Sequence, residues 1–304
     1  MQIELDGISY YAYTGGRPFD ASRPVIAFVH GAEHDHSVWA LQSRYLAHHG
    51  FSVLAVDLPG HGRSGGKPLP DVGSMADWLI ALLRTAGVQR ATLVGHSMGS
   101  LIALDAAGRA DAPVERLALV GTAFPMKVSD ALLEAARDDE PRAFDMINYW
   151  SHSTINARPG CPGPGFSIFM QNRRLMERQR PGVLLTDFNA CNIYADGLQR
   201  ADALRCPVLF ALGKRDLMTA PRQARTLIEH CRAAAQAHGQ PAPRVVEIAD
   251  CGHNLMAEQP EALLAALRDF VAAALPAAPA SPAEPTSPAG PTSPTAPQSR
   301  PAQA

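Results

Sequence analysis

The sequence predicts an α/β fold with a doubly wound, mostly parallel sheet, an inserted helical lid and a disordered proline-rich C-terminal tail. Three observations lead to this prediction. Short runs that are apolar on both faces recur along the chain, which is typical of strands inside a parallel sheet. Helical patterns separate these runs, and strand–helix alternation implies right-handed crossovers that cover both faces. Two long stretches break the alternation, one with only helical patterns and one rich in proline.

The N-terminal segment, Gln2 to Tyr13, alternates apolar and polar residues enough to form an antiparallel edge strand or hairpin. The parallel strands expected after it are 25–29, 52–56, 91–94, 117–120, 208–212 and 244–248. The helices expected between and after these strands are 37–49, 74–86, 98–109, 221–237 and 260–274. Residues 1–123 and 204–275 therefore form the predicted core, which is long enough for one large domain.

Residues 124–203 interrupt the alternation because they hold helical stretches and no strand run. The helical stretches are 129–138, 141–150, 167–180 and 183–198. Open α/β sheets bind ligands beyond the carboxyl ends of their strands. An all-helical insertion between two parallel strands is therefore expected to form a lid above that edge.

The C-terminal residues 276–304 contain nine of the 26 prolines, eight of them at every third position. This stretch has no leucine, valine, isoleucine or aromatic residue, so it cannot bury enough apolar surface to offset the entropy of ordering. A period of three matches polyproline II, which has three residues per turn. We expect a disordered, extended tail. Its functional alternative is a spacer or a ligand for a proline-binding module.

The overall composition excludes several classes of partner. The chain of 304 residues has 27 basic and 29 acidic side chains, and this balance gives no reason to bind nucleic acid or an anionic membrane. Five scattered cysteines without a C-x-x-C pair argue for a reducing compartment. The N-terminus does not resemble a signal peptide, and no apolar run approaches the ~18 residues of a membrane span. A cytoplasmic protein without a membrane span is expected, and its oligomeric state is left open.

Ser97 is the candidate nucleophile. It stands in Gly95-His-Ser-Met-Gly99, which follows a predicted strand and precedes a predicted helix. A serine on a sharp strand-to-helix turn has strained backbone geometry, and a glycine two residues away on either side leaves room for it. This context is what separates the motif from an ordinary turn made of small residues.

A serine hydroxyl needs an adjacent base, and the base needs an acid that orients it. His253 follows the last predicted strand, and Asp216 follows the strand before it, so both lie on the same sheet edge as Ser97. The order Ser97, Asp216, His253 is the one expected for this architecture. The alternative role for Asp216 is to cap the helix that follows it. Asp250 is the alternative acid, although it lies only three residues from His253 and is better placed to close a turn.

A tetrahedral oxyanion needs two converging hydrogen-bond donors. The amide of Met98 is one, because Met98 follows the nucleophile at the start of a helix. The turn after the strand 25–29 should supply the other, and we expect it to be the amide of Ala32. His30 and His61 are expected to be structural, with hydrogen bonds to loop backbone beside the site.

Five elements of the sequence occur in the order and spacing of a known family. They are His30-Gly31 with Trp39 eight residues after the glycine, Asp57-Leu-Pro-Gly-His-Gly-Arg-Ser64, Gly95-His-Ser-Met-Gly99, Asp216 and His253. Together they resemble the α/β-hydrolase superfamily over roughly residues 20–275. The resemblance implies the same nucleophile, acid, base and oxyanion amides as the reasoning above, a structural role for the 57–64 loop, and no cofactor.

Departures from the family's subgroups narrow the expected chemistry. Ser97 in place of aspartate speaks against haloalkane dehalogenases and epoxide hydrolases. The H-G-G-G run of many lipases and the H-G-G-P-G run of proline iminopeptidases are missing, and His96 stands where C–C hydrolases of the meta-cleavage type usually have asparagine. The remaining resemblance is to carboxylesterases, to methyl-ester and monoacylglycerol hydrolases, and to cofactor-free perhydrolases.

The sequence therefore predicts a serine hydrolase that cleaves a small to medium carboxylic ester through an acyl-enzyme on Ser97. One alternative keeps this triad but cleaves a C–C bond or performs perhydrolysis. A second is a non-catalytic small-molecule receptor on the same fold. A third is an interaction protein that acts through its proline-rich tail.

Apolar side chains of the predicted lid are candidates for the substrate pocket. We expect substrate contacts from Trp150, Phe166, Phe169 and Phe188. The alternative is that these residues, with Phe144, Tyr149, Met170 and Met176, pack the lid helices together. His34-Asp-His36 suggests metal ligands, but a hydrolytic zinc site needs three protein ligands, so solvated or capping roles are favoured and no metal is expected. Arg173, Arg174, Arg178 and Arg180 are expected on a solvated helical face, with an acidic substrate as the alternative.

Overall fold

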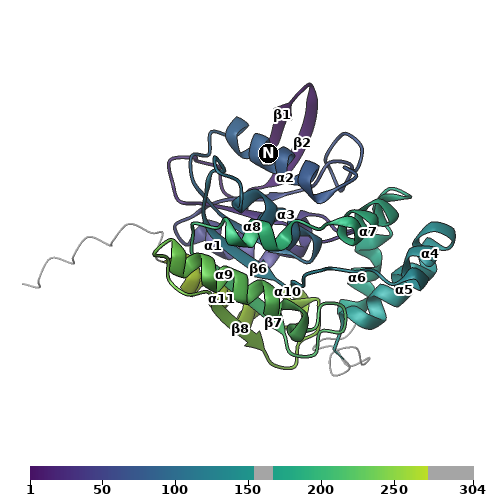
Figure 1. Ribbon diagram of the computed structural model, residues 1–304. Coiled ribbons are helices and arrows are strands. Elements are labelled where there is room, and N and C mark those ends of the chain that lie inside the picture. Colours follow the sequence, from purple (N-terminus) through teal and green to yellow (C-terminus); the bar gives the residue numbers. More distant parts are fainter. Residues whose placement is uncertain (154–166, 273–304) are drawn as a thin grey trace, which may run out of the picture.

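The computed structural model describes residues 1–153 and 167–272, and in this part of the chain one sheet of eight strands lies between layers of helices (Figure 1). The strand order is β1-β2-β4-β3-β5-β6-β7-β8. The strands are β1 (Gln2–Leu5), β2 (Ile8–Tyr13), β3 (Val25–Val29), β4 (Ser52–Val56), β5 (Ala91–His96), β6 (Val114–Val120), β7 (Val208–Gly213) and β8 (Arg244–Ile248). In the hairpin β1–β2, strand β2 pairs antiparallel with β4. The other six strands, β3 to β8, are all parallel to one another.

Helices cover both faces of the sheet. The helices packed on it are α1 (Ala40–His48), α2 (Val72–Thr85), α3 (Met98–Ala107), α9 (Arg225–Ala237) and α11 (Pro260–Val271). Shorter turns are η1 (His36–Trp39), η2 (Pro221–Ala224) and α10 (Leu255–Glu258). One apolar core contains α2, α3 and α9, and the core on the opposite face contains α1 and α11. The predicted doubly wound fold is confirmed.

Strand β3 shows why the sequence produces two cores. Val25, Ala27 and Val29 belong to one core, while Ile26 and Phe28 belong to the other, because successive side chains of a strand point to opposite faces. All five residues are almost completely buried. Burying a large apolar side chain contributes about 1.5–3 kcal/mol, so apolarity on both faces favours a central position in the sheet.

The long connection between β6 and β7 contains helices but no strand in its described part. It contains α4 (Asp130–Asp138), α5 (Glu140–Ser151), α6 (Ile168–Met176), α7 (Val183–Ile193) and α8 (Gly197–Asp202). Helices α4, α5, α6 and α7 share a separate apolar cluster and form a group at one side of the molecule (Figure 1). Helix α8 packs instead on α3 and α9. The division of the chain into a core and a lid stays a prediction.

One predicted helix is two helices in the structure. The sequence pattern favours a single helix over 183–198, but α7 ends at Ile193 and Tyr194 has extended backbone angles. The next helix begins at Gly197, where a Cβ atom would overlap the ring of Phe124. Close packing of the chain against Phe124 therefore accompanies the break.

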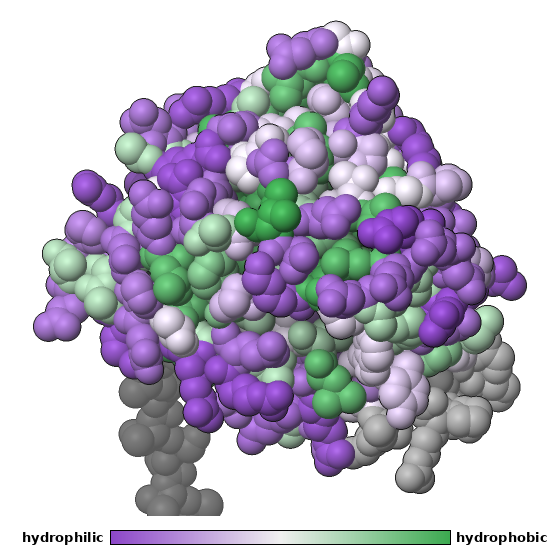
Figure 2. Space-filling view, turned by 45° about the vertical axis from the view of Figure 1, so that its right-hand side comes forward, coloured by the Kyte–Doolittle hydropathy of each residue, from purple (hydrophilic) through white to green (hydrophobic). Residues whose placement is uncertain are grey.

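The surface is mixed in character. The face in Figure 2 is mainly hydrophilic, with apolar side chains in small, separate patches. Among the described residues, no helix combines the length and the apolar character that crossing a bilayer requires. The predicted tail, residues 276–304, and the predicted pocket residue Phe166 lie outside the described residues.

Candidate active site

Ser97 occupies the turn between β5, which ends at His96, and α3, which begins at Met98. Its φ angle is 53° and its ψ angle is −121°, a combination that residues with side chains rarely adopt. Such strain persists only where the surrounding structure determines the backbone strongly, and it is concentrated at functional sites. The turn therefore has the geometry expected of a nucleophile.

The two glycines of the motif are required by close backbone approach. A Cβ atom on Gly95 would overlap the carbonyl of Gly99, and one on Gly99 would overlap the carbonyls of Val29 and His30. Neither overlap can be relieved by a flexible side chain, because every atom concerned belongs to the backbone. The small residues thus allow α3 to start directly against the end of β3.

Asp216 and His253 lie together on the carboxyl edge of the sheet. Asp216 Oδ2 is 2.8 Å from His253 Nδ1, and both residues are buried. Burial acts to raise the pKa of Asp216, but His253 and the hydrogen bonds from His253 and Thr219 outweigh it and lower that pKa. The carboxylate is therefore ionised and accepts the Nδ1 proton, which leaves His253 Nε2 able to accept another.

Neighbouring groups hold the Asp216 carboxylate in place. Its Oδ1 accepts the backbone amides of Met218 and Thr219, each at 2.8 Å, so Asp216 also closes a turn. The hydroxyl of Thr219 also donates to Asp216 Oδ2, a contact that no sequence pattern predicts. Asp250, the alternative acid, has a φ of 49° and pairs with Arg215 at 3.0 Å.

His96 is a second residue that the sequence analysis did not place in the site. Its Nε2 lies 2.9 Å from the backbone carbonyl of His253, and the two rings are 4.7 Å apart. A carbonyl only accepts, so His96 Nε2 carries a proton. Burial, followed by the nearby His253, lowers the pKa of His96 well below its usual value. His96 is thus a neutral donor that fixes the backbone of His253.

The predicted oxyanion residues lie close to Ser97. Met98 is the first residue of α3, where backbone amides have no partner within the helix. Ala32 follows Gly31, and a Cβ atom added at Gly31 would lie only 3.2 Å from the Cβ of Ser97. His30 and His61 both form hydrogen bonds to loop backbone. His30 Nδ1 is 2.8 Å from the carbonyl of Gly31, and His61 Nδ1 is 3.0 Å from the carbonyl of Pro59.

Two cavities meet at Ser97. One has a volume of about 30 Å³ and the other of about 180 Å³. The residues that line both are Ala32, Ser97, Phe188, Met218 and His253. Of the other predicted pocket residues, Trp150 lines the larger cavity. Phe169 lies against the ring of His152 at 5.7 Å and is not among the described residues that line either cavity.

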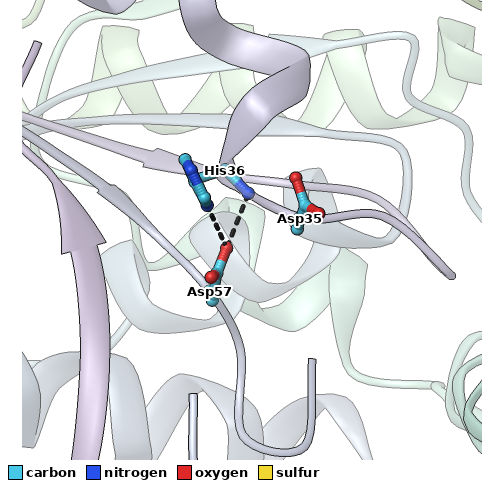
Figure 3. A group of neighbouring side chains, drawn as sticks. All are labelled: Asp35, His36 and Asp57. Carbon is cyan, nitrogen blue, oxygen red and sulfur yellow. Dashed lines mark hydrogen bonds and ion pairs between the residues drawn. The ribbon is translucent and has the colours of Figure 1, made fainter. Parts of the chain in front are cut away.

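The His34-Asp-His36 segment does not act as one unit. His34 Nε2 is 3.0 Å from Asn172 Oδ1, whereas the backbone amide and Nδ1 of His36 bond to Asp57 Oδ1 (Figure 3). Asp35, His36 and Asp57 are close enough to hold a metal ion. Every carboxylate oxygen of this group, however, already accepts a hydrogen bond from a protein donor. The hydrogen bonds between His36 and Asp57 therefore hold the loop after β3 against the loop after β4.

The arginines of α6 and the turn after it bind protein groups. Arg173 pairs with Glu177 at 2.9 Å and also with Asp145. Arg178 pairs with Asp35 at 3.2 Å, and Arg180 donates to backbone carbonyls of the 57–66 loop. The guanidinium groups of Arg173, Arg178 and Arg180 thus bind other parts of this chain, and Arg178 and Arg180 lie beyond the end of α6 at Met176. The solvated helical face stays a prediction.

Comparisons with known proteins place the chain in a family. Over 214 residues it is 30% identical to the pimeloyl-[acyl-carrier protein] methyl ester esterase of Chromobacterium violaceum, a match that covers 68% of this chain and 81% of that protein. It is 33% identical over 131 residues to an acetyltransferase component of the acetoin cleaving system of Cupriavidus necator. That match covers 42% of this chain and only 33% of the relative.

The fold also matches solved structures. The enol-lactonase of Burkholderia xenovorans LB400 superposes with a TM-score of 0.75 at 24% identity, covering 90% of this chain and 100% of the enzyme. The alpha/beta hydrolase family matches residues 26–267, a range that contains Ser97, Asp216 and His253. With the strained turn at Ser97 and the eight-stranded sheet described above, this match shows that the chain belongs to the alpha/beta hydrolase family.

Proposed function

We propose that this chain is a serine hydrolase that cleaves a small to medium carboxylic ester through an acyl-enzyme on Ser97. The observation that carries the proposal is the arrangement at the junction of the two cavities. Ser97 and His253 line both cavities, and His253 Nδ1 is hydrogen-bonded to the ionised carboxylate of Asp216. A nucleophile, a base and an orienting acid are thus present in one place.

The reaction follows from these groups. His253 Nε2 accepts the proton of Ser97 as Oγ attacks the ester carbonyl, and Asp216 stabilises the imidazolium that forms. The amides of Ala32 and Met98 donate to the developing oxyanion. His253 then gives its proton to the departing alcohol. Water enters, loses a proton to His253 and attacks the acyl-enzyme, and the acid leaves as Ser97 regains its proton.

We also propose that residues 124–203 act as a lid that shapes the substrate pocket. Trp150 and Ile147 from α5 and Phe188 from α7 line the cavities beside Ser97. Residues of an insertion that reach the nucleophile in this way exclude water and select substrates. Ala32 and Ser97, from the turns after β3 and β5, also line the pocket.

The known activities of two similar proteins support ester chemistry. The Chromobacterium violaceum protein is a methyl ester esterase and the Burkholderia xenovorans protein is an enol-lactonase. A lactone is a cyclic ester, so both act on an acyl–oxygen bond. C–C hydrolysis and perhydrolysis use the same triad, and only substrates separate them from ester hydrolysis.

The test is labelling of Ser97 followed by turnover. The wild-type protein and Ser97→Ala are treated with a fluorophosphonate probe, the labelled peptide is identified by mass spectrometry, and hydrolysis of p-nitrophenyl acetate and butyrate is measured. We expect label on Ser97, and loss of both label and turnover in Ser97→Ala with unchanged thermal unfolding. The matched control is Ser22→Ala, which changes an exposed loop serine.

Three results would contradict the proposal. Absence of label on Ser97 with no ester turnover would favour the receptor interpretation. Cleavage of a vinylogous diketone at a kcat/KM above that of every ester tested would favour C–C hydrolysis, and faster reaction of the acyl-enzyme with hydrogen peroxide than with water would favour perhydrolysis.

A further inference from the structure

Asp187 on α7 is a completely buried acid that the reaction above does not use. Its Oδ2 accepts the backbone amide of Glu33 at 2.9 Å and lies 2.8 Å from His61 Nε2. Glu33 belongs to the loop after β3, and His61 to the loop after β4. One oxygen from the helical insertion therefore joins the loop after β3, which lies beside Ser97, to the loop after β4.

The backbone at Glu33 needs this support. The amide of His34 donates to the carbonyl of Gly31 at 3.3 Å, so residues 31–34 form a turn with Ala32 and Glu33 at its centre. The φ angle of Glu33 is 57°, at a turn position that usually requires glycine or asparagine. A strained peptide persists only where its surroundings hold it. Asp187 supplies a buried acceptor for the amide of that strained residue.

The second contact of Asp187 is with a charged histidine. His61 Nδ1 faces the carbonyl of Pro59 at 3.0 Å, and Nε2 faces the carboxylate of Asp187. Both partners only accept, so both ring nitrogens carry protons. Burial acts to lower the pKa of His61, but Asp187 and the carbonyl of Pro59 outweigh it and raise that pKa. The buried carboxylate is therefore held as the counter-ion of a fixed imidazolium.

We propose that Asp187 is a positioning residue that holds the Ala32–Glu33 peptide, and with it the oxyanion-binding amide of Ala32, against Ser97. This inference rests on the proposed function, which gives Ala32 its role. The next residue, Phe188, lines both cavities, so α7 is joined to the substrate pocket and to the oxyanion turn at adjacent positions. The helical insertion thus supports the transition-state site and does not only cover it.

The test separates transition-state binding from substrate binding. Asp187→Ala and Asp187→Asn are compared with the wild type for kcat and KM on p-nitrophenyl butyrate. They are also compared for the inhibition constant of an alkyl trifluoromethyl ketone, which adds to Ser97 and places an oxyanion on the Ala32 and Met98 amides. Asp145→Asn is the matched control, because Asp145 is an exposed acid of α5 in the same insertion.

We expect Asp187→Ala to lower kcat and to raise the ketone inhibition constant by the same factor, about 10- to 100-fold, with KM changed less than about threefold. Asp187→Asn keeps an oxygen for the Glu33 amide but loses the charge opposite His61, so it should show a smaller loss than Asp187→Ala and the same equality of the two factors. Asp145→Asn should leave all three constants unchanged.

The proposal is overturned if kcat and the ketone constant stay at wild-type values, or if KM rises by the full factor while the ketone constant does not move. If Asp187→Ala does not fold, Asp187→Asn decides by the same criteria. Failure of the proposed function gives a different result, because wild-type protein would then neither hydrolyse the ester nor bind the ketone covalently.

Discussion

The hydroxyl of Thr219 lies 2.7 Å from Asp216 Oδ2 and donates a hydrogen bond to it. The hydroxyl oxygen of Thr219 is also 3.0 Å from His253 Nδ1, so Thr219 contacts both the acid and the base of the proposed triad. A neutral hydroxyl that donates to a carboxylate lowers the carboxylate's proton affinity and fixes its rotation.

Replacing Thr219 by valine should slow catalysis without unfolding the protein. Valine has the shape of threonine but no hydroxyl, and losing a hydrogen bond to a charged group costs about 1.5–3 kcal/mol. We expect kcat to fall by about one order of magnitude and KM to change little, because the substrate does not need this contact to bind. Steady-state kinetics on p-nitrophenyl butyrate measure both constants. Thr219→Ser, which keeps the hydroxyl, should recover most of kcat; equal losses in the two variants would contradict the role.

Replacing Gly99 by alanine should destabilise the fold. A Cβ atom there overlaps the carbonyls of Val29 and His30, and both are backbone atoms at the end of a central strand. We expect a loss of about 3 kcal/mol in the free energy of unfolding, at the upper end of the usual range for overpacking. Thermal and urea unfolding measure it. In the control, Gly182→Ala, no atom lies within 4 Å of the new Cβ, so only its positive φ costs energy, ~1 kcal/mol. Equal stabilities would contradict the overlap.

The parts of the fold that the sequence predicts are those encoded locally. Strand β3 is apolar on both faces because helices cover both, and that pattern is visible without a structure. The turn at Ser97 is equally local, since both glycines that it needs lie within two residues. Asp216 and His253 follow from chain order, because parallel strands bring their carboxyl ends to one edge.

The residues that the sequence does not reveal depend on distant partners. Asp187 is 154 residues from Glu33 and 126 from His61, and no spacing rule links positions so far apart. His96 contacts a carbonyl 157 residues away, and a backbone acceptor leaves no trace in side-chain composition. These contacts are set by packing of the helical insertion and the loops, which follows from the whole fold.

Replacing Glu33 by glutamine should change how stability depends on pH. Burial, with the nearby Asp187, raises the pKa of Glu33 from 4.5 to about 9. Between these values the folded chain keeps a proton that the unfolded chain releases, so the free energy of unfolding falls as pH rises. Glutamine cannot titrate. We therefore expect Glu33→Gln to match the wild type near pH 4.5 and to be more stable at pH 8, measured by urea unfolding.

The control for this prediction is Glu229→Gln, a change on the exposed face of α9. It should leave the pH dependence of unfolding as it is in the wild type. A Glu33→Gln protein whose stability declines between pH 5 and 9 as steeply as that of the wild type would show that Glu33 is ionised in the folded state.

The unequal cavities beside Ser97 predict unequal tolerance for the two sides of an ester. With about 30 Å³ on one side and about 180 Å³ on the other, we expect one side of the ester to be shorter than the other. Two series test this, alkyl acetates of increasing alcohol length and methyl esters of increasing acyl length. We expect kcat/KM to fall sharply in one series only.

Replacing Ile147 by alanine enlarges the small cavity and should extend that series by one or two carbons. Each added carbon should raise kcat/KM by up to about fourfold, at ~0.8 kcal/mol per buried CH₂. Leu132→Ala, in the larger cavity, should not extend it. An equal decline in both series for the wild type would contradict the inference that each cavity holds one side of the ester.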